Sequence, residues 1–216
     1  MKIIDVFLEL LYPTRCAFCH RLTEGGQKVC PKCRKELPYT AGLAQRQKLR
    51  QVEVCLAPLY YENSVRDSLL RYKFKGLTGY AEIYGEILAK CVDENEISCD
   101  IITWVPLSRK RLRRRGYDQA GLLAEDLACR LGLPCEPLLR KRRDNPAQSG
   151  QGAYEKRREN VRGVYEAQEP ERVNGRRVLL VDDIVTTGAT LSECAAVLKA
   201  AGAATVRAAA VARRRD

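Results

Sequence analysis

Two adjacent carboxylates follow a run of apolar residues in the C-terminal part of the chain. In the stretch VLLVDDIVTTGAT, at positions 178–190, four apolar residues lead into Asp182 and Asp183. Neighbouring anions repel each other, so such a pair indicates a place where solvent, a metal ion or a ligand rich in hydroxyl donors satisfies both. The apolar run predicts a buried strand, and ligands bind beyond the carboxyl ends of strands in open parallel sheets. We therefore expect Asp182 and Asp183 to accept hydrogen bonds from ribose hydroxyls.

The residues after the carboxylates have the composition of a phosphate-binding loop. The residues that lead into the next expected helix are small or carry a hydroxyl group: Thr186, Thr187, Gly188, Ala189 and Thr190. Gly188 permits close backbone approach, and the free N–H groups at the start of a helix form a concave anion site. A carboxylate pair beside such a loop suits a sugar phosphate. The alternative interpretation is a buried strand that ends in a capped turn and binds nothing.

Four of the ten cysteines have metal-binding spacing. They form two Cys-x₂-Cys pairs with ten residues between them: Cys16, Cys19, Cys30 and Cys33. This spacing is typical of tetrahedral Zn²⁺ held by four thiolates, which leaves no open coordination position and indicates a structural site. Four free thiols are the alternative. We expect the remaining cysteines to be small buried hydrophobes: Cys55, Cys91, Cys99, Cys129, Cys135 and Cys194.

Positive charge is concentrated in the middle of the chain. Positions 106–162 contain 15 Lys or Arg and 7 Asp or Glu, a net charge of +8 out of +11 for the whole chain. Such an excess favours a polyanionic partner, for which a nucleic-acid backbone is our candidate, and a solvated basic face is the alternative. The candidate nucleic-acid contacts are Arg113, Arg114, Arg115, Arg142, Arg143, Arg157 and Arg158.

The first residues resemble a signal peptide only superficially. The apolar run is interrupted by Asp5 and Glu9, so we expect a short amphipathic helix that ends at Pro13. No later segment approaches the roughly 20 apolar residues that cross a bilayer. We expect a soluble, cytoplasmic protein without membrane insertion.

Alternating apolar runs and amphipathic segments predict the architecture that positions these residues. We expect strands at 52–61, 100–106, 176–184 and 204–212, and helices at 64–75, 81–92, 120–131 and 190–201. Continuous apolar strands that alternate with helices predict an α/β fold, with a parallel sheet covered by helices on both faces. We expect two domains: the N-terminal helix and zinc ribbon at 1–45, and the α/β domain at 46–216.

Two motifs resemble those of known families. Four apolar residues, two acids, two apolar residues and then Thr-Thr-Gly-x-Thr resemble the phosphoribosyl pyrophosphate (PRPP) motif of type I phosphoribosyltransferases. The pattern VPL…R…RG-aromatic-x-Q, followed by R…Q…R..N, resembles the ComF family of competence-associated phosphoribosyltransferase-like proteins. The similarity runs nearly end to end and includes a zinc ribbon ahead of the transferase domain. ComF-type chains have Asn where this chain has Asp118.

The resemblance implies roles for individual residues. Asp182 and Asp183 would be the catalytic residues and would hold the ribose 2′- and 3′-hydroxyls, partly through Mg²⁺. The loop at 186–190 would hold the 5′-phosphate, and Arg109 and Lys110 would contact pyrophosphate. The polar segment after Arg140 would be a flexible loop that closes over PRPP. Implied partners are PRPP, single-stranded DNA, a competence DNA translocase or helicase, and a second copy of the chain in a homodimer.

Three functions remain open at this point. The first is a ComF-like protein that binds PRPP with Mg²⁺ and single-stranded DNA in DNA uptake, with pentosyl transfer to an unknown acceptor. The second is a sensor or scaffold that binds PRPP or DNA without turnover. The third is a metabolic phosphoribosyltransferase that acts on an amine or a base.

Overall fold

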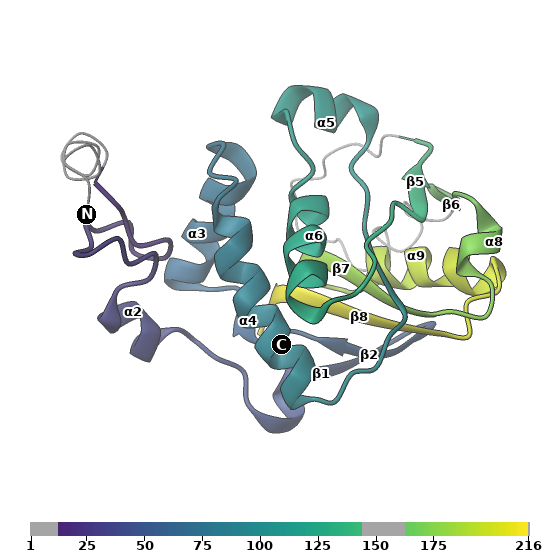
Figure 1. Cartoon of the computed structure of the whole chain (residues 1–216), viewed down its shortest axis with the longest axis horizontal. Helices are drawn as coiled ribbons and strands as arrows, with labels where there is room; N and C mark the ends of the chain where they lie inside the picture. The colour runs from purple at the N-terminus through teal and green to yellow at the C-terminus, as the bar shows by residue number, and fades with distance from the viewer. Residues whose placement is uncertain (1–12, 144–162, 216) are drawn as a thin grey trace.

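A computed structural model describes residues 13–143 and 163–215 of the 216-residue chain. The helix expected in residues 1–12, and Arg157 and Arg158, lie outside the described residues. The described N-terminal part contains α2 (Pro31–Glu36) and the short 3₁₀ helix η1 (Gly42–Gln45). The α/β part begins with strand β1 (Arg46–Leu49) and ends with β8 (Thr205–Arg213) (Figure 1).

The main sheet is mostly parallel. Its order is β1-β2-β8-β7-β4, and β3 also pairs with β8. The other strands of this sheet are β2 (Val52–Leu56), β3 (Leu59–Tyr60), β4 (Ile101–Trp104) and β7 (Arg177–Val185). Strands β2, β3 and β7 run parallel to β8, and β4 runs parallel to β7, whereas β1 is antiparallel to β2. The predicted parallel sheet is confirmed, with an antiparallel edge that was not predicted.

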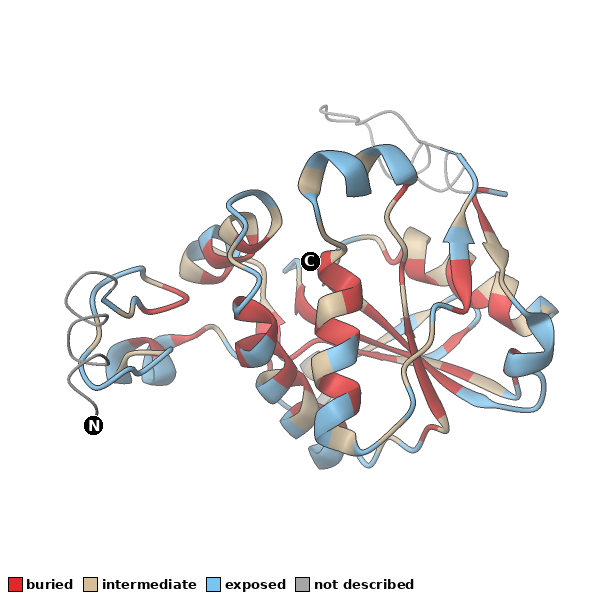
Figure 2. Ribbon diagram, turned by 45° about the horizontal axis from the view of Figure 1, so that its top comes forward, coloured by how far each residue is buried: buried red, intermediate tan, exposed pale blue. Residues whose placement is uncertain are grey.

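Helices cover both faces of this sheet, as predicted. One face packs against α3 (Asn63–Phe74), α4 (Tyr80–Glu94) and α6 (Gln119–Leu131), and the other packs against α9 (Ala189–Ala200). Alternate residues of β7 divide between the two cores, because side chains of a strand alternate in direction. Leu179 and Val181 belong to the first core, and Val178 and Leu180 belong to the second. Figure 2 shows the buried strands between the helical layers.

Four small elements between β4 and β7 had no sequence prediction. Helix α5 (Arg109–Arg115) stands apart from the sheet, as Figure 1 shows. Strands β5 (Leu139–Lys141) and β6 (Tyr165–Ala167) form an antiparallel pair, and the short helix α8 (Pro170–Val173) follows them.

Candidate functional site

The two carboxylates lie in the last part of β7 and reach to opposite faces of the sheet. Asp183 is 4% exposed and faces α3, where its Oδ2 lies 2.5 Å from the Nζ of Lys73. Asp182 lies toward the face of α9, where burial raises the pKa of Tyr165 and of Cys194 and the charge of Asp182 adds to both shifts. A ligand at this strand end would therefore meet one carboxylate on each side of β7.

Burial dominates the electrostatics of this strand end. Burial raises the pKa of the Asp182 carboxyl to about 7, and the charges of Lys73 and Lys141 oppose that shift. Burial also lowers the pKa of Lys73 to about 8. Poorly solvated charged groups gain from a ligand that supplies hydrogen-bond donors or a cation. The site thus suits a ligand with several hydroxyls and an accompanying metal ion.

The loop at 186–188 joins the carboxylates to the start of α9. Gly188 has a left-handed backbone (φ 69°) and directly precedes Ala189, the first residue of the helix. The Ala189 N–H donates to Thr187 Oγ1 at 3.3 Å, which folds the loop over the helix start. Thr186 is exposed and Thr190 is partly exposed. The strand-loop-helix arrangement predicted for the phosphate-binding residues is therefore present.

The side chain of Leu49 in strand β1 packs against the loop at Gly188. A Cβ atom at Gly188 would overlap Leu49 Cδ2 and lie 2.9 Å from Leu49 Cδ1. No side chain larger than hydrogen fits here without displacement of Leu49. The hairpin of β1 and β2 is thus part of the support of the candidate phosphate loop.

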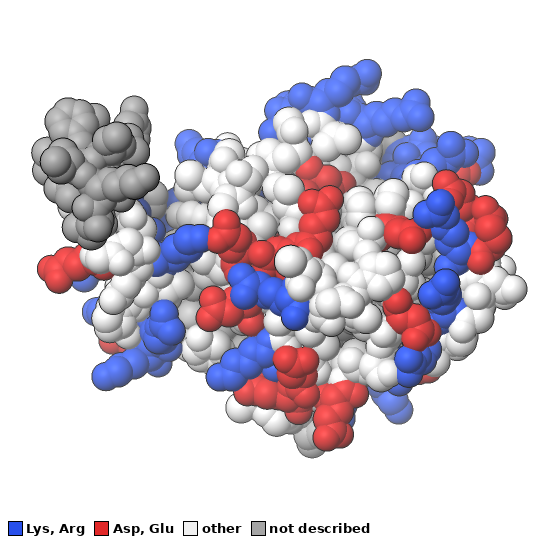
Figure 3. Space-filling view, viewed as in Figure 1, with Lys and Arg blue, Asp and Glu red and all other residues white. Residues whose placement is uncertain are grey.

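A basic cavity of about 680 Å³ lies between α5 and the β5–β6 pair. Two acidic residues, Asp118 and Glu166, line it together with seven cations: Arg109, Lys110, Arg113, Arg140, Lys141, Arg142 and Arg143. Figure 3 shows Lys and Arg side chains gathered over α5 and toward β5. Lys141 lines this cavity, and its charge opposes the rise in the pKa of Asp182. The cavity offers a polyanion a cationic wall.

Helix α5 distributes the predicted arginines over two cavities. Six of its seven residues are cationic, and the Ser108 hydroxyl caps it by accepting the Arg111 N–H at 3.3 Å. Arg113 lines the basic cavity with the predicted pyrophosphate contacts, Arg109 and Lys110. Arg114 and Arg115 line a separate cavity. Arg142 and Arg143 follow β5 and share the basic cavity. The predicted basic residues that the structure describes thus form two groups.

Asp118 has a structural role at the start of α6. Its Oδ1 accepts the N–H groups of Ala120 at 3.1 Å and Gly121 at 3.3 Å. Its Oδ2 accepts the Leu107 N–H at 2.9 Å, which ties the loop before α5 to α6. Burial raises the pKa of Asp118, and these backbone donors oppose the shift. The carboxylate is occupied by the protein's own N–H groups rather than by a ligand.

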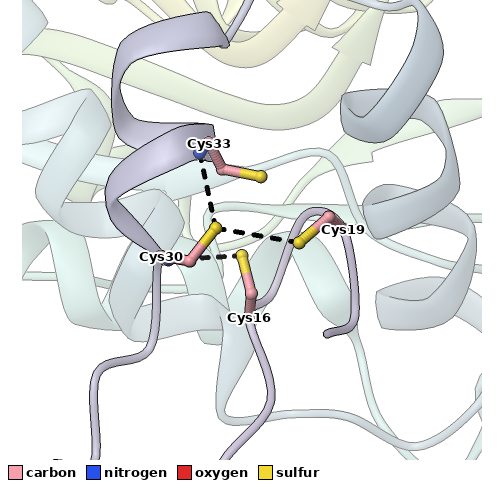
Figure 4. Close-up of side chains that lie close together, drawn as sticks. All are labelled: Cys16, Cys19, Cys30 and Cys33. Atoms are coloured by element: carbon pink, nitrogen blue, oxygen red, sulfur yellow. Dashed lines mark hydrogen bonds between the residues drawn. The ribbon is translucent and has the colours of Figure 1, made fainter. Parts of the chain in front are cut away.

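The four cysteines with metal-binding spacing come together as predicted. Their sulfur atoms all lie within 4.8 Å of one another, and the Sγ atoms of Cys19 and Cys30 are 3.8 Å apart (Figure 4). The Cys30 and Cys33 N–H groups point to cysteine sulfurs at 3.4 Å, which suits thiolate ligands. Four clustered thiols with such donors fit a tetrahedral zinc site.

The other cysteines follow the prediction with one clear exception. Cys55, Cys91, Cys99 and Cys194 are buried and Cys135 is partly buried. The prediction was wrong for Cys129, which is exposed because it lies on the outer side of α6.

The zinc-binding segment docks on α3 and α4. Phe18, between the first two cysteines, is 1% exposed and packs edge-on against Tyr84 with ring centroids 6.2 Å apart. Arg71 of α3 donates to the carbonyl oxygens of Ala17 at 3.1 Å and Phe18 at 2.6 Å. The conformation of this segment is therefore coupled to the core of the α/β part.

The sequence motifs did not single out two residues of the site, Lys73 and Lys141. Lys73 lies 110 positions before Asp183, so no local sequence pattern indicates their contact.

The described part of the chain has no helix that is both long and apolar enough to span a bilayer.

Comparison with known proteins identifies two domain families and several relatives. Residues 116–216 match the phosphoribosyl transferase domain family, and residues 7–45 match the double zinc ribbon domain family. DNA utilization protein YhgH of Escherichia coli O157:H7 is 35% identical over 208 residues, which cover 89% of this chain and 87% of the relative. Competence protein ComFC of Streptococcus pneumoniae is 28% identical, with 89% and 84% covered.

Two further similarities cover shorter parts of the other proteins. Competence protein F of Haemophilus influenzae is 37% identical over 100 residues, 45% of this chain and 43% of that relative. The solved structure of glutamine PRPP amidotransferase from B. subtilis is similar with a TM-score of 0.45 and 25% identity, over 64% of this chain and 30% of that one. With its zinc ribbon, its phosphoribosyltransferase-type α/β domain and a curated relative 35% identical over 89% of the chain, the chain belongs to the ComF family of competence-associated phosphoribosyltransferase-like proteins.

Proposed function

We propose that this protein binds PRPP with Mg²⁺ at the carboxyl end of β7. The observation that carries the proposal is that the loop at 186–190 directly follows Asp182 and Asp183 at the end of β7, with the basic cavity on the side of Lys141, whose charge lowers the pKa of Asp182. PRPP offers a matching group to each, with a 5′-phosphate, ribose hydroxyls and a pyrophosphate. Arg109 and Lys110 would face the pyrophosphate.

The two carboxylates would also hold the metal ion. Mg²⁺ is bound through one or two carboxylates together with substrate phosphates, and this donor set is available here. When bound, the ion supplies positive charge that stabilises the leaving pyrophosphate. The chain itself would contribute the cations of the basic cavity, which would stabilise the negative charge that develops as pyrophosphate leaves. The reaction we propose is transfer of the phosphoribosyl group to an acceptor.

Binding and turnover are tested separately. Calorimetric titration with PRPP and Mg²⁺ should show binding that Asp182→Asn with Asp183→Asn abolishes, while Glu94→Gln, on the surface of α4, leaves it unchanged. A pyrophosphate-release assay then follows, with and without single-stranded DNA. Tight binding without release would leave a PRPP sensor, and wild-type affinity in the double variant would contradict the proposal.

We also propose that the basic cavity and α5 bind single-stranded DNA, as the names of the relatives suggest for their own DNA-related roles. If 6–10 phosphates are contacted, affinity should fall about 10³–10⁵-fold between 50 and 200 mM salt. Arg113→Gln with Arg142→Gln should weaken binding, and Lys32→Gln with Lys90→Gln, outside this surface, should not. A flat salt dependence would contradict a phosphate-backbone contact.

The family resemblance supports three further parts of the proposal. They are a cytoplasmic location, a competence DNA translocase or helicase as partner, and a homodimer. Light scattering of the purified chain measures the last of these directly, and a monomeric mass at all concentrations tested would exclude the dimer.

A further inference from the structure

A second cavity adjoins the strand end on the side of α3. Its volume is about 240 Å³, and it is lined by Lys73, Phe74, Gly76, Arg114, Arg115 and Tyr117. It is separate from the basic cavity, which α5 lines with other residues. Because Lys73 Nζ lies 2.5 Å from Asp183 Oδ2, one side chain spans the distance from this cavity to the carboxylate.

The walls of this cavity are planar and cationic. Phe74 is 59% exposed, an unusual state for a large apolar side chain at the end of a helix, and the Arg115 guanidinium lies 5.1 Å from its ring centroid. The Tyr117 hydroxyl donates to the Tyr72 carbonyl and fixes the second ring. Lys73 and Arg114 add two more cations. Flat aromatic and guanidinium groups bind planar rings by stacking, and cations select an anionic substituent.

We propose that this cavity is the acceptor subsite and that its acceptor is a small planar heterocycle carrying a carboxylate or another anionic group. The inference rests on the proposed function, since the acceptor must approach C1′ of a ribose held at Asp183. The volume is below the roughly 300–1,000 Å³ typical of drug-sized ligands, so it suits one small ring system. Burial also lowers the pKa of Arg115, so an anion would meet a poorly hydrated cation.

The transfer balances without further reactants. A ring nitrogen of the acceptor forms a bond to ribose C1′ as the bond from C1′ to the pyrophosphate oxygen breaks. Pyrophosphate leaves with that electron pair, and any proton on the nitrogen passes to solvent. Lys73 would lie between the acceptor's anionic group and the ribose carboxylate, as a positioning residue that couples occupancy of the two subsites.

Matched probes with and without a carboxylate test this inference. Ligand-detected NMR compares orotate with uracil and nicotinate with nicotinamide, each with and without PRPP and Mg²⁺. We expect at least one acid to bind tenfold more tightly than its neutral counterpart. Phe74→Ala and Arg114→Gln should each weaken that binding at least fivefold. Arg66→Gln, an exposed arginine of α3 that lines neither cavity, should leave it unchanged.

The outcomes separate this subsite from the function on which it rests. Equal binding of acid and neutral probes, or unchanged binding in Phe74→Ala, would overturn the acceptor inference even where PRPP binds normally. Absence of PRPP binding would overturn the proposed function, and the comparison of acid with neutral probe without PRPP would still decide the subsite. Loss of single-stranded DNA binding in Phe74→Ala, with no acid bound, would make the cavity a base-stacking surface and contradict the inference.

Discussion

Replacement of Gly188 by alanine perturbs the candidate phosphate loop at the point where it meets β1. The φ angle there is 69°, a left-handed conformation, so any side chain adds backbone strain. The new Cβ would also overlap the side chain of Leu49. Two separable effects, strain and steric overlap, therefore act on one residue that directly precedes α9.

The magnitude follows from these two effects. A left-handed conformation costs a residue with a Cβ about 1–2 kcal/mol. Leu49 can turn away because the overlap involves the end of its side chain, at about 0.5–1.5 kcal/mol for a strained rotamer. The free energy of unfolding should fall by about 1.5–3.5 kcal/mol, which lowers the Tm by roughly 3–14 °C at 2–4 °C per kcal/mol.

Gly132 provides the matched control. Its φ is 65° and a Cβ there has no neighbour within 4 Å, so Gly132→Ala carries the strain without the overlap. Chemical denaturation should show Gly188→Ala as the more destabilising variant, and Leu49→Ala should remove the difference in the double variant. Gly188→Ala should also weaken PRPP binding, whereas Gly132→Ala should not. Equal stabilities of the two alanine variants, or additive effects with Leu49→Ala, would refute this reasoning.

Three other perturbations have defined outcomes. Asp118→Asn removes an acceptor from the partly buried Leu107 N–H. An unpaired buried donor costs about 1–3 kcal/mol and a partly buried one less, so a thermal melt should show a lower Tm; an unchanged Tm would contradict the assigned cap. Metal analysis should find one Zn²⁺ per chain. Cys33→Ser should lose the zinc and destabilise the whole α/β part. An unchanged Tm of the metal-free protein would exclude a structural role for the metal. The Arg177 guanidinium lowers the pKa of Asp100 from 3.8 to about 2, so this pair's stabilisation is complete above pH 3.8 and lost as pH falls through about 2. Asp100→Asn should flatten the dependence of stability on pH in that range, and an identical acid profile would count against the pair.

The central strand and its loop could be predicted because their signals are local. Four apolar residues, two acids and a Thr/Gly turn lie within 13 positions, 178–190, and β7, the loop and α9 follow that order. The clustering of the four cysteines could likewise be predicted from their spacing, because two short Cys-x₂-Cys turns need few contacts with the rest of the chain. The parallel arrangement followed from continuous apolar strands that alternate with helices.

The unpredicted features depend on contacts between distant residues or on weak local patterns. Helix α5 has a single apolar residue, Leu112, among its seven, so apolar periodicity carries no signal. Its cap at Ser108 and its end at Gly116 were the available signals. Strands β5 and β6 have three residues each and lie far apart in the chain. The ion pair between Lys73 and Asp183 is set by how α3 packs on the sheet.

A crystal structure of the protein with PRPP and Mg²⁺ tests the central claim most directly. The account predicts the 5′-phosphate at the start of α9, the ribose hydroxyls at Asp182 and Asp183, and the pyrophosphate toward Arg109 and Lys110. Density for the ribose away from the end of β7, or an empty strand end at saturating PRPP, would contradict it.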